Sequence, residues 1–347
     1  MEAAYRQHDR PARGELQLIF DATWHPGHGS LSNLADGAVA TLSSFLTSRI
    51  LYAIAVVFGV SLAVFFLIRL GGDPSALFLP PEASVEEIER FRHLMGFDRP
   101  LVVQYLDFIS RALQGDFGMS LRYEQPAMQL VLERVPATLE LSGMALALSL
   151  VVSIPLAILA AAWRGSALDR ASLLVSLIGQ SFPAFWLAIM LILLFSETLH
   201  VLPPSGRGGW QNLLMPAIVL ATYSTAIITR LLRSSMIEVL QSDYIRTARG
   251  KGMSEGSIIF KHALRNAAIP TLTVIGLQVG ALLGGAVITE EVFAYPGIGR
   301  LAIQAIANRD FTVVQAFVLV MAVTIVTVNL LVDLSYGLLD PRLRKSK

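Results

Sequence analysis

The chain has 347 residues, of which 54% are hydrophobic and 15% charged, and its mean hydropathy is +0.60. Soluble domains carry about 25% charged residues, so this composition excludes a pair of soluble domains, and it also excludes an intrinsically disordered chain. The absence of cysteine excludes disulfides and thiolate chemistry, and a net charge of +1 does not favour nucleic acid as a partner. The class that remains is an integral membrane protein.

Residues 1–48 form a weakly apolar segment of mixed charge without clear periodicity, and we interpret them as an N-terminal cytoplasmic tail. His25 and His28 lie close together in the sequence His-Pro-Gly-His, where a metal site is conceivable. No further ligands cluster nearby, so a flexible tail is the favoured interpretation.

Six long stretches lack Asp, Glu, Lys and Arg, and a bilayer core about 30 Å thick requires about 20 such residues for each spanning helix. The first stretch is not followed by a small-residue cleavage site, which favours an uncleaved anchor over a signal peptide. None shows the short alternation of a barrel strand. We therefore predict an all-α integral membrane protein with six transmembrane helices, in the stretches 50–68, 141–163, 171–196, 208–229, 266–289 and 311–332.

The distribution of Lys and Arg predicts the orientation of these spans. Thirteen of these residues fall in three segments, and only three fall in the two short loops between them; the segments are 164–170, 230–265 and 341–347, and the loops are 197–212 and 290–310. The positive-inside rule then places both termini in the cytoplasm. The first transmembrane helix covers 49–69, the core with the other five covers 137–340, and 341–347 is a cytoplasmic tail.

The segment 70–136 is external in this orientation. Acidic residues early and basic residues late in 83–95 suit a helix dipole and predict a helix there, which Ser84 is placed to cap. Apolar residues at helical spacing predict a second helix over 101–113. Residues 115–120 resemble a turn. We expect a small helical external segment between spans 1 and 2.

Motif analysis gives this chain no nucleotide site and no catalytic set. The spacing G-x-G-x-x-A occurs at 297–302, but no strand precedes it and no acidic residue follows at the required distance. Gly250-Lys251-Gly252 lacks the glycine and the Ser or Thr of a phosphate loop. A membrane enzyme would need a clustered catalytic set, which is missing.

Polar residues within the spans are neutral, and the carboxylates sit at span ends, at Glu140, Glu290, Glu291 and Asp333. Proton-coupled transporters usually carry charged groups at mid-membrane, so an ion-coupled secondary transporter of small polar solutes is the less favoured alternative, together with a channel. The neutral mid-span groups either line a passage or bond neighbouring helices, and both interpretations stay open; they are Gln180, Ser181, Gln278 and Asn329. Pro155, Pro183, Pro216 and Pro270 suggest kinks or ordinary packing.

The inner loop 230–265 is long and contains a predicted short helix. Asp243 is a candidate N-cap for a helix over Tyr244–Arg249, and Gly250 and Gly252 end it. Ser254 is a candidate cap for a second helix, Glu255–Leu264. A helix this short needs a packing partner. With Tyr244 and Ile245 expected to be exposed, it either docks on a protein or rests on lipid headgroups through Arg246, Arg249 and Lys251.

This loop resembles the cytoplasmic loop of ABC importer permeases, and most closely that of the dipeptide/oligopeptide/nickel branch. The general family loop reads E-A-A, three residues, G, nine residues, then I-x-L-P. Here Arg246-Thr247-Ala248, Gly252 and His262-Ala-Leu-Arg265 occupy those positions, an altered form characteristic of the peptide branch. The resemblance runs from about residue 48 to 344, and its other motifs are Gly72-Asp-Pro74, Gly96–Pro100, Gly115–Ser120, Pro136–Glu140, Arg164-Gly-Ser166, Ser181–Trp186, Glu290–Gly299 and Asp340-Pro-Arg342.

The resemblance implies a type I ABC importer permease fold in a bacterial inner membrane. It implies that this subunit forms half of a translocation pathway with a second homologous permease. Two cytoplasmic ATPases that hold ATP and Mg, and an external solute-binding protein, would complete the importer. Di- and oligopeptides lead as substrates, with nickel chelates, glutathione and opines behind. The ATPase-coupling residues implied are Asp243, Tyr244, Ile245, Arg246, Thr247, Ala248, Gly252, His262, Leu264 and Arg265; those implied for an external gate or binding-protein contact are Glu290, Glu291, Phe293 and Pro296.

Overall fold

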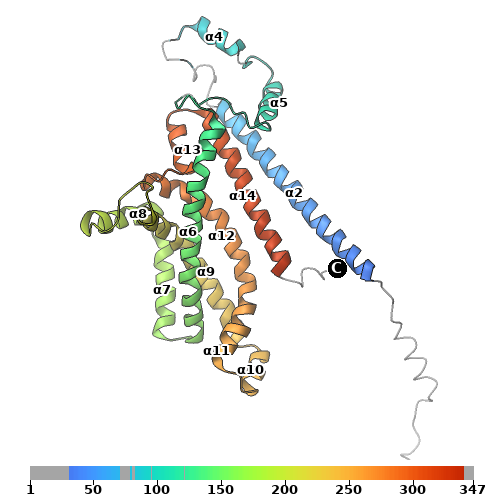
Figure 1. Ribbon diagram of the computed structural model, residues 1–347, viewed down its shortest axis with the longest axis vertical. Helices are drawn as coiled ribbons and strands as arrows, with labels where there is room; N and C mark the ends of the chain where they lie inside the picture. Colours follow the sequence, from blue (N-terminus) through green and yellow to red (C-terminus); the bar gives the residue numbers. More distant parts are fainter. Residues whose placement is uncertain (1–30, 71–78, 80–82, 95, 121, 340–347) are drawn as a thin grey trace, which may run out of the picture. The chain divides into compact units, whose positions relative to one another are not determined.

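The computed structural model describes residues 31–70, 79, 83–94, 96–120 and 122–339 (Figure 1). The predicted histidine pair at 25 and 28 and the tail 341–347 lie outside these ranges. The chain divides into two units, Met1–Ile50 and Leu51–Lys347, and α2 (Leu31–Leu70) passes from one to the other. The described part is helical, and its only bridge between extended residues joins Met119 to Pro126.

Five helical segments in the described residues are long and apolar enough to cross a membrane. They confirm five of the six predicted spans. Three of them continue well past the predicted ends: α6 begins 14 residues before 141, α9 ends 11 residues after 229, and the fifth span begins 11 residues before 266. The five are Thr47–Ile68 within α2, α6 (Ala127–Ala162), α9 (Trp210–Leu240), Glu255–Val292 and Phe311–Val332 within α14 (Phe311–Leu339).

The third predicted span, 171–196, is broken at Pro183, one of the four prolines named as candidate kinks, and is not one continuous helix. α7 (Ala167–Ser181) is followed by α8 (Ala184–Leu191) and the π-helix η1 (Ile192–Thr198). The helix axis bends by 101° between α7 and the segment Ala184–Thr198. Pro183 has no N–H for a helical bond and forces the preceding residue into an extended conformation, here Phe182 at φ −85° and ψ 130°. Counted as one bent span, the pair completes six.

The other prolines within the spans lie inside continuous helices. Pro136 and Pro155 are in α6, Pro216 is in α9 and Pro270 is in α12 (Leu264–Val292). Membrane helices tolerate proline when neighbouring groups satisfy the freed carbonyls. Proline alone therefore does not predict where a span breaks.

The spans pack through small side chains as well as large ones. α6 lies against α9, α12 and α14, and α9 lies against α7 and α12. Many of the buried positions between α6, α9 and α12 are alanines, such as Ala137, Ala145, Ala217, Ala221 and Ala286. Small residues let helices approach closely, which matters in lipid because transfer from water no longer drives the helices together.

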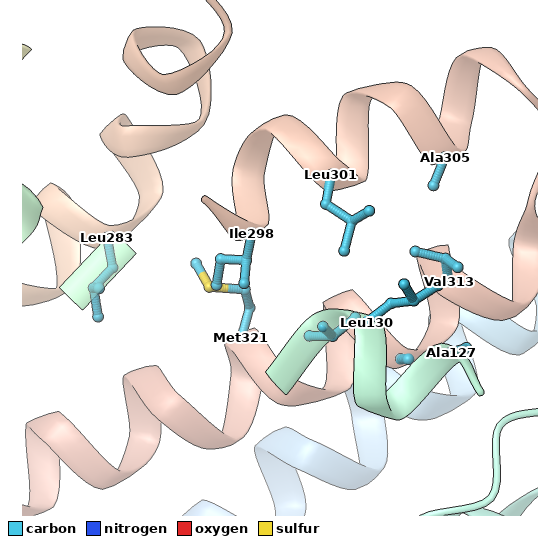
Figure 2. Packing of buried hydrophobic residues seen from close by; sticks show 10 residues of the cluster. Ala127, Leu130, Leu283, Ile298, Leu301, Ala305, Val313 and Met321 are labelled. Carbon is cyan, nitrogen blue, oxygen red and sulfur yellow. The ribbon is translucent and has the colours of Figure 1, made fainter. Parts of the chain in front are cut away.

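A second core joins α13 (Ile298–Ala307) to the spans around it. Figure 2 shows Ile298, Leu301 and Ala305 of α13 directed toward side chains of α6 and α14. The partners labelled there are Ala127 and Leu130 of α6, Val313 and Met321 of α14, and Leu283 of α12.

The segment between the first two spans contains the two predicted helices. α4 (Val85–Leu94) begins with a reciprocal cap: Glu87 N donates to Ser84 Oγ at 3.3 Å, and Ser84 N donates to the Glu87 carboxylate at 2.8 Å. The hydrogen bond from the Ser84 backbone lowers the pKa of Glu87. α5 (Leu101–Ala112) packs through Tyr105 and Phe108 against α2 and α14. Both predicted helices are confirmed.

Candidate functional site

The inner loop contains a short helix, α10, over Asp243–Gly250. Ser242 occupies the N-cap position, and its hydroxyl donates backward to the Val239 carbonyl at 2.6 Å. The predicted N-cap at Asp243 is therefore wrong by one residue. Asp243 is the first helical residue and pairs with Arg246 on the next turn, where an acidic group also suits the helix dipole.

α10 ends in a Schellman motif, and Gly252 supplies its left-handed residue as predicted. Gly252 has φ +78°, its N–H donates to the Arg249 carbonyl at 2.9 Å, and Met253 N–H donates to the Ala248 carbonyl at 3.3 Å. Gly250 is the last helical residue. A Cβ at Gly252 would meet open space, so the positive φ alone favours glycine here.

The two side chains expected to be exposed on α10 differ. Tyr244 is 46% exposed, but Ile245 is fully buried, so the expectation of an exposed Ile245 is wrong. α10 packs against the π-helix η2 (Ile258–Ala263), and Ile245 is the one buried side chain of α10. The surface that α10 leaves open is mainly polar: Asp243, Tyr244, Arg246, Thr247 and Arg249.

Polar contacts hold α10 against the start of the next span. Asn266 Nδ2 donates to the Tyr244 hydroxyl at 2.9 Å. Arg249 forms a two-bond ion pair with Glu255, with distances of 2.7 Å and 3.1 Å, and the hydrogen bonding to Glu255 raises the pKa of Arg249. A helix of eight residues is unstable alone in water, so these contacts and Ile245 fix its position.

The second predicted helix of the loop continues without a break into the fifth span. Ser254 accepts from Ser257 N at 3.4 Å, which confirms the predicted cap, and α11 (Glu255–Ser257) leads through η2 into α12. π-segments often mark functional sites. His262 lies in this one, and its Nε2 is buried without a hydrogen-bond partner among the described residues. Leu264 packs on the inner core of α6 and α9, and Arg265 is exposed.

An ion pair that the sequence analysis missed lies between α7 and α9. Arg233 donates to both carboxylate oxygens of Asp169, at 2.5 Å and 2.9 Å, and the Asp169 side chain is almost fully buried. Gly165 N also donates to Asp169, at 2.9 Å. The spacing Ser166-x-x-Asp169, with Ser166 as N-cap, was the available signal, but the sequence does not identify Arg233 as the partner.

At the end of the spans opposite α10, Glu290 is fully buried inside the chain. Its carboxylate accepts from Thr138 Oγ1 at 2.5 Å, from Gly299 N at 2.8 Å and from Arg300 N at 3.1 Å. Thr138 Oγ1 accepts in turn from Ile298 N at 2.9 Å. One carboxylate therefore joins α6 and α12 to the N-terminus of α13, where an anion is favoured.

The glycines of the rejected nucleotide motif have a packing role. A Cβ at Gly297 would lie 2.1 Å from the Glu290 carboxyl carbon, and one at Gly299 would lie 2.5 Å from the Val287 Cα. Both positions exclude a side chain because α13 crosses so close to α12. The G-x-G spacing thus reflects the accommodation of Glu290.

The other predicted outer residues are divided between surface and interior. Glu291 is exposed, Pro296 is partly exposed and Phe293 is buried. Nearby, Arg207 of the loop 199–209 donates to the Glu140 carboxylate at 2.5 Å and 3.0 Å, and Gly206 N donates to the Phe293 carbonyl at 2.9 Å. Burial raises the pKa of Tyr295, which neighbours this pair, to about 12.

The four mid-span polar residues have different surroundings. Gln278 is buried, and Ser224 Oγ donates to its amide oxygen at 3.0 Å, so it bonds α9 to α12. Ser181 and Asn329 are exposed on this chain, and Gln180 is partly exposed. Among the residues that the structure describes, no group of three or more His, Asp or Glu side chains could hold a metal ion.

The fold is that of an importer permease. Inward-facing structures of the MetNI methionine ABC transporter match it with TM-scores of 0.52 and 0.50, at 18% and 17% identity, over 61% of this chain and 97% of theirs. At this identity the likeness concerns the fold alone.

The family follows from the sequence. Residues 153–345 match the model of the binding-protein-dependent transport system inner membrane component, and residues 42–142 match the N-terminal model of that group. The chain belongs to this family of ABC importer permeases. Membership supports an ABC importer permease over an ion-coupled secondary transporter.

Two curated relatives span almost the same length. The glutathione transport system permease protein GsiC of Escherichia coli (strain K12) is 39% identical over 302 residues, which cover 87% of this chain and 99% of the relative. The di/tripeptide transport system permease protein DppB of Pseudomonas aeruginosa (strain UCBPP-PA14) is 41% identical over 338 residues, which cover 88% and 99%. The chain is thus a multi-pass inner membrane protein of the peptide branch.

Proposed function

We propose that this chain is the permease subunit of an importer for short peptides, a class that includes di- and tripeptides and glutathione. The observation that carries the proposal is α10, a short helix fixed at the inner end of the spans with a polar surface left open. The full-length similarity to permeases named for glutathione and for di/tripeptides supports the substrate class.

In this proposal the partners supply everything that the chain lacks. ATP and Mg bind on two cytoplasmic ATPase subunits, a second permease forms the other half of the pathway, and an external binding protein delivers the peptide. Both termini are cytoplasmic, which places α10 on the ATPase side and the Glu290 cluster on the outer side. The coupling residues are those of α10 and η2, with Tyr244 and Arg246 at the open surface.

Coupling requires that the ATPase contact differ in free energy between inward-open and outward-open states. Closure of the ATPases around ATP would displace α10, and α10 is fixed to the fifth span by Ile245, by Tyr244–Asn266 and by Arg249–Glu255. Movement of α10 is therefore transmitted to a spanning helix.

The test is ATP-driven uptake in proteoliposomes. The chain, its co-expressed partner subunits and the external binding protein are reconstituted with ATP inside, and labelled dipeptide and glutathione are offered outside without an ion gradient. We expect uptake that requires ATP and the ATPase subunit. Uptake that continues without the ATPase would overturn the proposal, and binding of a nickel chelate or an opine, but no peptide, to the binding protein would overturn the substrate class.

The role of α10 is tested separately with cysteines, since the chain has none of its own. A cysteine at Tyr244 or Arg246 should cross-link to the ATPase subunit. Asp107→Cys on α5 is the control and should not. Equal cross-linking at all three positions would contradict the docking role.

A further inference from the structure

α5 carries three distinct stripes along its length. At 3.6 residues per turn, the buried side chains Gln104, Tyr105 and Phe108 share one side of the helix. An apolar stripe lies next to it, formed by Val102, Leu106 and Leu113, which are 70%, 60% and 84% exposed. A polar stripe lies beyond that, formed by Asp107, Ser110 and Arg111 and followed by Gln114 in the turn after the helix, and Val103 is the only apolar residue on it.

The buried side fixes α5 against the first span. The Ser61 hydroxyl donates its hydrogen to the Phe58 carbonyl at 2.7 Å, so Tyr105 OH donates to Ser61 Oγ at 2.8 Å. The Tyr105 ring also meets Phe65 and Phe58 edge-on, with centroids 5.1 Å and 6.0 Å apart. These contacts are to residues inside the apolar segment Thr47–Ile68.

The contacts of α5 lie well inside the ends of both neighbouring spans. Ser61 lies seven residues before Ile68, the outer end of the first span, which is about 10 Å along a helix. Leu319, in the same cluster, lies eight residues after Phe311, the outer end of the last span, which is about 12 Å. α5 is thus packed beside the spans below their outer ends, although sequence reasoning placed it in an external cap.

We infer that α5 is embedded in the outer leaflet of the bilayer, with its apolar stripe against lipid acyl chains and its polar stripe at the headgroups. The first span, against which α5 packs, also exposes large apolar side chains, among them Phe58, Phe66 and Leu67. The polar stripe has the charged and amide groups that an interfacial helix directs to water, and Asp107 is paired there with Arg99 at 3.3 Å.

The native chain has no cysteine, so single cysteines can report the environment of each stripe. Val102→Cys and Leu106→Cys probe the apolar stripe, and Ser110→Cys and Gln114→Cys are matched controls on the polar stripe. Each carries an environment-sensitive fluorophore in the full-length chain in nanodiscs, both alone and assembled with its partner subunits. Quenching is measured with phosphatidylcholine spin-labelled near the glycerol end of its chains, and with aqueous iodide.

We expect several-fold stronger quenching by the spin-labelled lipid at positions 102 and 106 than at 110 and 114, and the reverse order with iodide. The pattern should be the same in the assembled transporter. Iodide quenching at 102 and 106 equal to that of the controls would place the stripe in water and overturn the inference. Loss of lipid quenching at 102 and 106 on assembly would show that a partner subunit covers the stripe, which would also overturn it.

Discussion

Gly252 and Gly299 restrict substitution for different physical reasons. Gly252 has open space around it but a positive φ, so a side chain there strains the backbone and not the packing. Gly299 is limited by contact, because an added Cβ would lie 2.5 Å from a backbone atom of α12. A side chain at Gly252 should therefore destabilise the end of α10, whereas a side chain at Gly299 should impair folding.

Gly252→Ala should destabilise the end of α10 by about 1 kcal/mol, since an L-residue in the left-handed region costs that amount. Gly250→Ala is the control, because Gly250 is helical and its Cβ position is open. We expect faster amide hydrogen exchange in α10 and reduced ATP-coupled uptake for Gly252→Ala only, while insertion of the spans is unchanged. Equal behaviour of both variants would contradict the role of φ.

Gly299→Ala should impair folding, because the clash with Val287 is with main-chain atoms that cannot rotate away. Gly284→Ala, on the same helix as Val287 but with nothing near its Cβ position, should be tolerated. The yield of monodisperse protein in detergent and its thermal unfolding measure the difference. A Gly299→Ala protein as stable as Gly284→Ala would refute the close approach of α13 to α12.

At the scale of elements, α7 has two different ends. Its N-terminal end is held to α9 by the Asp169–Arg233 ion pair, and its C-terminal end stops at the break before Pro183. The inner half of the third span is therefore fixed to the bundle, and the chain direction changes only beyond Ser181.

Asp169→Asn should destabilise the protein by about 3 kcal/mol, because it leaves the mostly buried Arg233 without its charge partner. The double variant Asp169→Asn/Arg233→Gln should recover part of this loss, since no buried charge remains. Thermal unfolding in detergent of the two single variants and the double variant forms a double-mutant cycle. Additive effects would show that the pair contributes no coupling free energy.

At the scale of the whole molecule, the outer loop 199–209 connects the redirected half of the third span to α9 and is fixed to α6 by Arg207–Glu140. Both side chains are 43% exposed, so this ion pair is weaker than a buried one and can separate. The hydrogen bond to Glu140 raises the pKa of Arg207.

Linking this loop permanently to α6 should stop transport. In Glu140→Cys/Arg207→Cys, a bifunctional thiol reagent should abolish uptake, and reductive cleavage of the link should restore it. Each single-cysteine variant treated in the same way should keep its uptake, which separates the effect of the link from that of modification. Full transport with the link in place would show that the loop and α6 do not separate.

Much of this fold was predictable because its signals are local. Charge-free stretches give the spans, and caps such as Ser84 and Ser254 depend on neighbours three residues away. The buried state of Glu290 was not predictable, because it depends on Thr138, which is 152 positions distant. The burial of Ile245 was missed because it depends on what packs beside α10. Pro183 was named as a possible kink, but the sequence could not show that the span breaks there, because four other prolines lie in unbroken helices.

The fifth span has a mechanical consequence. Glu255–Val292 is a continuous helix of 38 residues, about 55 Å long, with the α10 contacts at its inner end and Glu290 near its outer end. A rod of that length converts a tilt of about 5° at one end into a displacement of about 5 Å at the other. In the proposed coupling, a small rotation imposed on α10 would be enlarged at the far end of this helix, where the Glu290 carboxylate holds α6 and α13.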